Sequence, residues 1–164
     1  MKNLQVLAVG MAMWVCAGAA MAEKPSPLAG TWVLVAADTL QPDGRRVHGY
    51  GEHPQGRLLI DRQGRYSLQI YRSETQPFVS GDKGRGTEAE YRDAVMRLSA
   101  HMGTVRLEPG SKTIVFEITR SLFPNWEGAK QMRQYELRDG VLSYQVPASA
   151  TGNGTVAVSE WRKE

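Results

Sequence analysis

The sequence predicts an all-β, mainly antiparallel domain of about eight strands with one short helix. Apolar and polar residues alternate with a period of two along most of the chain from residue 31 onward. Turn sequences such as Pro42-Asp43-Gly44 and Asp139-Gly140 separate these short runs, and only one segment has helical spacing. Many short antiparallel strands form either a sandwich or a closed barrel, and both remain open on the pattern alone.

The N-terminal segment has the three parts of a secretory signal peptide. Lys2 supplies the positive charge, residues 4–16 are almost wholly apolar, and small residues lead to Ala20-Met21-Ala22. A membrane anchor is the alternative, but the run is short and a polar, Pro-rich lead-in over 23–27 follows it. We therefore expect residues 1–22 to be removed, the protein to be periplasmic or secreted, and the mature chain to have no membrane span.

The mature chain is expected to be one domain, residues 28–164. Removing 22 of 164 residues leaves 142, which is a usual length for one domain. The only cysteine, Cys16, leaves with the signal, so no disulfide or thiolate chemistry is expected. Loss of Lys2 lowers the formal charge from +3 to +2, and the basic residues are interleaved with acidic ones. This distribution argues against nucleic-acid binding, and with no segment marking an interface we expect a monomer.

The first strand candidate covers residues 31–37. A hairpin follows, with arms at Arg57–Asp61 and Arg65–Arg72 around a turn at residues 62–64. Alternation in the second arm places three large apolar side chains on one face: Tyr66, Leu68 and Ile70.

The middle of the chain predicts a helix. Thr87-Glu88-Ala89-Glu90 is a capping box, and we expect a helix from about Glu88 to Ala100, with His101 at its C-terminal end. Such a helix would cover one end of the β structure. Its apolar face would contain Tyr91, Ala94, Val95, Leu98 and Met102.

Strands resume after this helix and continue to the C-terminus. In the strand over 112–120, Ile114, Phe116 and Ile118 alternate with Thr113, Glu117 and Thr119. The Asp139-Gly140 turn joins two others as a hairpin. The predicted strands are Thr104–Glu108, Lys112–Arg120, Lys130–Arg138, Val141–Val146 and Thr155–Arg162.

An ordered set of short motifs resembles the bacterial and fungal lipocalin-like domain family, whose members are calycin-type β-barrels. The resemblance covers nearly all of the mature chain and implies a closed barrel, here in an exported member. It also implies that an Arg near the end of the last strand packs over Trp32, and Arg162 is the candidate. The motifs are Gly30-Thr31-Trp32, Pro54-x-Gly56-Arg57-Leu58, Asp61-x-x-Gly64-Arg65, Ser80-Gly81-Asp82 and Ser121-Leu122-Phe123-Pro124-Asn125-Trp126.

The function favoured by such a barrel is the binding of a small apolar molecule. An eight-stranded barrel has an interior that holds either side chains or one small ligand. The loop at residues 121–128 carries large apolar side chains that would line the mouth of a cavity or plug it. The candidate ligand-binding residues are Trp32, Leu34, Tyr66, Leu68, Ile70, Ile114, Phe116, Ile118, Phe123 and Trp126.

Two other functions stay open. One is a barrel enzyme of the isomerase or cyclase type using a buried Glu or Tyr, for which the strand residues Glu117, Tyr135 and Glu136 are candidates. The other is a non-catalytic envelope protein with a filled barrel.

Catalytic and metal-binding signals are sparse. No Gly-x-Ser-x-Gly elbow occurs, and the spacing of His48 and His53 is not that of a zinc motif on a helix. We therefore expect binding rather than catalysis, with no metal and no cofactor.

Overall fold

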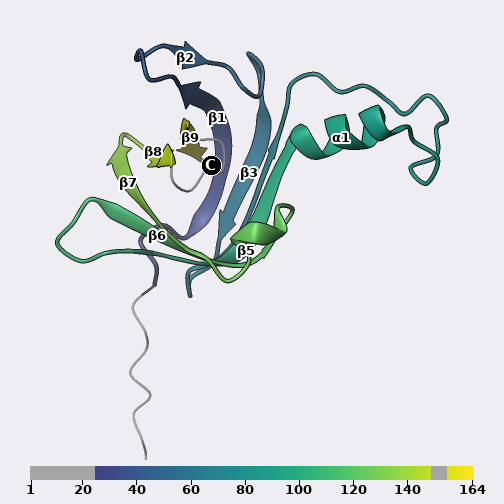
Figure 1. The fold of residues 1–164 in the computed structure, drawn as a ribbon. Coiled ribbons are helices and arrows are strands. Elements are labelled where there is room, and N and C mark those ends of the chain that lie inside the picture. The colour runs from purple at the N-terminus through teal and green to yellow at the C-terminus, as the bar shows by residue number, and fades with distance from the viewer. Residues whose placement is uncertain (1–24, 149–154) are drawn as a thin grey trace, which may run out of the picture.

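The computed structural model of the chain describes residues 25–148 and 155–164. The predicted signal peptide at residues 1–22 lies outside them. The described strands form one sheet in the order β2-β1-β3-β4-β5-β6-β7-β8-β9 (Figure 1). The strands are β1 (Gly30–Leu40), β2 (Arg46–Val47), β3 (Gln55–Ile60), β4 (Arg65–Tyr71), β5 (Leu98–Leu107), β6 (Thr113–Ser121), β7 (Lys130–Arg138), β8 (Val141–Val146) and β9 (Val156–Lys163).

Pairing between the first and last long strands closes the sheet into an antiparallel barrel of eight strands, with β2 appended to the end of β1. β1 pairs with β3 along its first residues and with β9 along most of its length, with an irregularity between Leu34 and Ala36. Closure of this kind leaves none of the long strands as an open edge. The structure therefore confirms the barrel and excludes the sandwich.

One end of the barrel interior is filled by large side chains. Trp32 donates its indole N–H to the Leu28 carbonyl over 2.9 Å, and the indole N–H of Trp161 donates to the Tyr144 hydroxyl over 3.1 Å. Leu28 precedes β1 and is fully buried against this cluster. Both indole donors are thus satisfied inside an apolar core, as stable burial of Trp requires.

The helix α1 (Glu88–Met96) is shorter than the sequence predicts. Its capping box between Thr87 and Glu90 is present, but residues 98–101 pair with β4 and belong to β5. The prediction that the helix runs to Ala100 is therefore wrong, because pairing along β4 gives those residues cross-strand partners that local spacing does not reveal.

The expectation that the helix covers a barrel end is also wrong. α1 has no buried residue, and it projects away from the barrel (Figure 1). Tyr91 packs against Phe78 of the preceding loop, with ring centroids 5.5 Å apart, instead of against the barrel core. Within the described ranges, neither α1 nor the short 3-10 helix η1 (Pro124–Trp126) is long and apolar enough to cross a membrane.

The residue over Trp32 is Lys163 and not Arg162. The Lys163 ammonium lies 5.2 Å from the centre of a Trp32 ring, whereas Arg162 is exposed. In β9 the inward positions are odd-numbered, since Ser159 and Trp161 are buried. The expectation that Arg162 packs over Trp32 is therefore wrong by one residue. A cation still lies over Trp32, but another side chain provides it.

Candidate functional site

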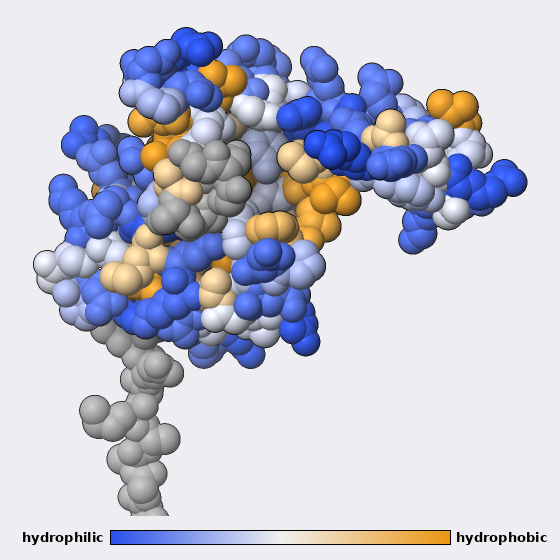
Figure 2. Space-filling view, in the orientation of Figure 1, coloured by the Kyte–Doolittle hydropathy of each residue, from blue (hydrophilic) through white to orange (hydrophobic). Residues whose placement is uncertain are grey.

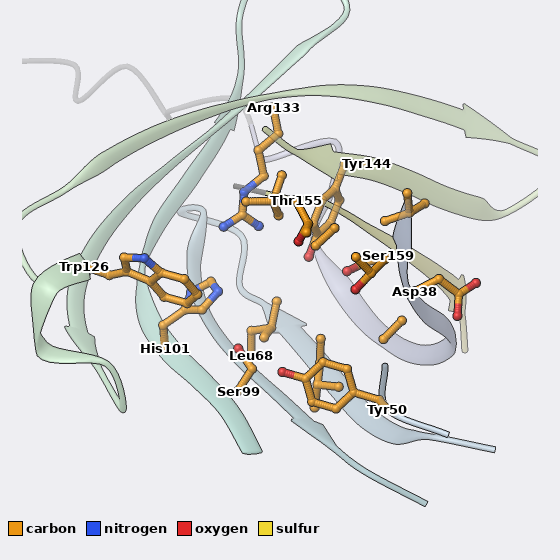
Figure 3. A pocket seen from close by; sticks show the side chains of 16 residues that line it. Asp38, Tyr50, Leu68, Ser99, His101, Trp126, Arg133, Tyr144, Thr155 and Ser159 are labelled. Carbon is orange, nitrogen blue, oxygen red and sulfur yellow. The ribbon is translucent and has the colours of Figure 1, made fainter. Parts of the chain in front are cut away.

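The barrel keeps an inner cavity of about 180 Å³ at the end opposite the filled core. Strands β1, β4, β5, β7, β8 and β9 all contribute to its wall, and Tyr50 and Trp126 reach it from two connections (Figure 3). Both apolar and hydrogen-bonding side chains line it. Its lining includes Asp38, Tyr50, Leu68, Ile70, Ser99, His101, Trp126, Arg133, Tyr144, Val146 and Ser159.

Arg133 brings a buried positive charge to this wall. It is 3% exposed, and its side chain runs from β7 into the cavity (Figure 3). The guanidinium lies 4.2 Å from the centre of the Phe116 ring, and its Nη2 donates to Oε1 of Gln131 over 2.5 Å. Burial lowers the pKa of Arg133 and the neighbouring Tyr144 raises it, but a guanidinium stays protonated in proteins. The cavity wall therefore carries a permanent cation.

His101 is the second buried polar group of the cavity. It is 6% exposed, and its Nδ1 lies 2.7 Å from the Tyr66 hydroxyl. Burial, and to a lesser degree the Arg133 charge, lowers the pKa of His101 to about 3. The imidazole is consequently neutral at physiological pH, and it offers hydrogen bonding to the cavity without adding charge.

Asp38 contributes a carboxylate at another part of the wall. It is 6% exposed, and its oxygens lie 2.8 Å from Arg46 Nη2 and 2.9 Å from His48 Nδ1. The hydrogen bond to Asp38, with the nearby Glu52 charge, raises the pKa of His48. The Asp38 carboxylate is thus compensated by basic groups of the β2 region.

An outer groove of about 310 Å³ adjoins the inner cavity. Tyr50, Ser99 and Trp126 line both spaces, so the outer groove lies directly beside the polar inner cavity. Figure 2 shows hydrophobic surface where α1 meets the barrel. The remaining side chains of the groove are mainly apolar and include Val95, Met96, Leu98, Leu122 and Phe123.

A family model described as a lipocalin-like domain matches residues 29–164, which include every barrel strand. The chain belongs to the lipocalin-like domain family. A comparison with curated proteins found no match. The lipocalin-like domain thus contains the whole inner cavity and the whole outer groove.

The structure places the ten predicted ligand-binding residues of the lipocalin-like domain in two groups. Leu68, Ile70 and Trp126 line the inner cavity, and Phe123 joins Trp126 in the outer groove. The other six belong to the buried core and do not line either space: Trp32, Leu34, Tyr66, Ile114, Phe116 and Ile118.

Sequence reasoning missed the polar residues that the lipocalin-like barrel turns inward. In β7 Gln131 and Arg133 are buried while Met132 is 56% exposed, the reverse of what hydropathy predicts. Pairing decides this, because Gln131 lies opposite the inward-facing Phe116 of β6. The signal available in the sequence was the Asp139-Gly140 turn. Its hairpin register determines which residues of β7 lie opposite the inward-facing residues of β8 and therefore also point inward.

The strand residues considered for catalysis do not reach the cavity. The side chains of Glu117 and Glu136 are 50% and 54% exposed, and Tyr135 is half-buried beside the core. Tyr50 and Tyr144 line the cavity instead. Within residues 25–148 and 155–164, no three His, Cys, Asp or Glu side chains are grouped as metal ligands.

Proposed function

We propose that the protein is exported and binds one small, mainly apolar molecule inside the lipocalin-like barrel. The observation that supports this is the inner cavity of about 180 Å³ that continues into an apolar groove of about 310 Å³. Export is supported by the signal-peptide pattern of residues 1–22.

The size of the two spaces limits the ligand. A protein cavity of roughly 150 Å³ holds a single benzene ring, and sites for larger ligands begin at about 300 Å³. The inner cavity therefore suits the head of a ligand or one ring. The outer groove would hold an attached apolar portion.

Native mass spectrometry of the protein purified from its own host tests this proposal. The expected result is the mass of a chain that begins at Glu23, together with a stoichiometric small molecule released on denaturation. A neutral fluorescent probe, N-phenyl-1-naphthylamine, should also bind with a rise in emission. An empty protein that leaves this probe and a panel of fatty alcohols unbound would overturn the proposal.

A plugging variant places the bound probe in the barrel. Val146 lines the inner cavity and is half-buried, whereas its neighbour Gln145 is exposed on the other face of β8. Val146→Trp should fill the cavity and lower the affinity for the probe about tenfold or more, while Gln145→Trp should leave it unchanged. Equal binding by both variants would place the probe elsewhere.

A barrel enzyme of the isomerase or cyclase type is the second candidate function. It is supported by His101 and Tyr144, two buried titratable groups in the cavity wall. With a pKa of about 3, His101 is a weak base, so its role in such an enzyme would be to orient the reacting group by a hydrogen bond. If the small molecule released from the native protein is chemically converted by the wild type but not by His101→Gln, and the variant still binds it, this candidate would be favoured over simple binding.

A further inference from the structure

Building on the proposed function, we infer that the ligand is an amphipathic monocarboxylate, whose carboxylate binds the Arg133 guanidinium and whose apolar tail lies in the outer groove. The chemistry on which this depends is a charge inside the barrel that lacks a counter-ion.

Arg133 has no anionic partner among the described residues. None of the ion pairs in residues 25–148 and 155–164 includes it, and its described partners are uncharged. The one buried carboxylate of the cavity wall, Asp38, is already paired with Arg46 and His48. A buried cation without an anion is costly, so a proteinaceous or bound anion is the expected compensation.

The guanidinium also has hydrogen-bonding capacity left. Gln131 accepts from Nη2, and the buried Nε finds no acceptor in the described structure. The face of the guanidinium packs over Phe116, and stacking on a ring occupies the face while the N–H groups point from the edge. A carboxylate accepts two such parallel N–H bonds, which is the arrangement Arg favours.

The rest of the wall limits the anion to a single charge. His101 is neutral, and Tyr50, Ser99 and Tyr144 add hydroxyl groups but no charge. A phosphate monoester would bring a second negative charge with no further cation inside the cavity and with the Asp38 carboxylate in the same wall. One carboxylate balances the one buried cation.

The tail direction follows from the shared lining. A chain leaving Arg133 passes Tyr50, Ser99 and Trp126, the residues common to both spaces, and then meets apolar side chains only partly covered by the protein. Val95, Met96 and Phe123 are 53%, 64% and 45% exposed. An alkyl or aromatic tail would cover this surface.

The test compares three ligands with one tail and different heads: decanoate, 1-decanol and decylamine, measured by displacement of N-phenyl-1-naphthylamine at pH 7. We expect decanoate to bind about tenfold to a hundredfold more tightly than decanol, as charge-assisted hydrogen bonds predict, and decylamine to bind most weakly. Arg133→Met should remove the preference but keep decanol binding. Arg138→Met, on the same strand at an exposed position, should retain it.

A second measurement does not depend on how well Arg133→Met folds. The pKa of the decanoate carboxyl group, followed by the chemical shift of its ¹³C-labelled carboxyl carbon, should be lower when decanoate is bound to the wild-type protein than when it is free, because Arg133 favours the anion. An unchanged or raised pKa of bound decanoate would overturn the inference, as would equal affinities for decanoate and decanol. Those outcomes leave the proposed function standing. Failure of all three ligands and of the neutral probe to bind would instead overturn the proposed function.

Discussion

Two histidines of this chain respond to pH in opposite directions because their surroundings differ. His48 is half-exposed beside Asp38, which raises its pKa, whereas burial lowers the pKa of His101 to about 3. Protonation therefore favours the native interactions of His48 and opposes those of His101.

The buried histidine should make the protein sensitive to acid. The unfolded pKa of His lies near 6.5, so below that pH the unfolded chain binds a proton that folded His101 refuses. Its contribution to stability is complete above pH 6.5 and falls as the pH drops toward 3, by up to about 3 kcal/mol between pH 7 and pH 4. Urea unfolding at these two pH values should show this fall in the wild type.

His101→Gln is the control, because it keeps a hydrogen-bonding side chain without the titration. As the pH falls, the free energy of unfolding of the wild type should decrease relative to that of the variant. Parallel pH profiles would contradict the buried, neutral state of His101. In NMR titrations of the wild type, His48 should change protonation above pH 6.5, where His101 should not.

The meeting of β5 and β6 depends on one small residue at a register shift. The shift lies between Met102 and Gly103, and a Cβ on Gly103 would come within 2.0 Å of the Glu117 carbonyl oxygen. Backbone cannot yield as a flexible side chain does. Gly103→Ala should therefore lower the free energy of unfolding by about 3 kcal/mol, measured by thermal or urea denaturation.

Gly49→Ala is the matched control for that substitution. A Cβ there would meet only the Thr39 hydroxyl, at 3.4 Å, so the expected change is within about 1 kcal/mol. Equal stability of the two variants would contradict the close contact between Gly103 of β5 and the Glu117 carbonyl oxygen of β6.

The whole molecule depends on its last strand. β9 pairs with both β1 and β8 and carries the fully buried Trp161. A chain ending at residue 155 would leave two long strand edges unpaired and a large gap in the core. We expect it to lose its cooperative unfolding transition in calorimetry.

A chain ending at Lys163 controls for the loss of terminal residues. It lacks only Glu164, whose exposed ion pair with Arg57 contributes less than about 1 kcal/mol. It should unfold cooperatively near the wild-type temperature. A cooperative transition in the shorter chain would show that the barrel does not need closure by β9.

Local patterns in the sequence determined most of the elements. The period-two spacing of Ile114, Phe116 and Ile118 predicts β6. The Asp139-Gly140 turn predicts the β7–β8 hairpin, and the capping box at Thr87 predicts where α1 begins. The ordered motifs also predict the family. These features depend on neighbours a few residues apart, which the sequence displays directly.

Tertiary structure decided closure, the end of the helix and the contents of the interior. Residues 98–101 are compatible with a helix or a strand, and pairing with β4 makes them a strand. Lys163 lies over Trp32 because of which face of β9 points inward. Arg133 is inward because Gln131 lies opposite Phe116, although hydropathy favours Met132. The physical reason is that a strand's period is local, whereas the face it buries is chosen by partners from distant parts of the chain.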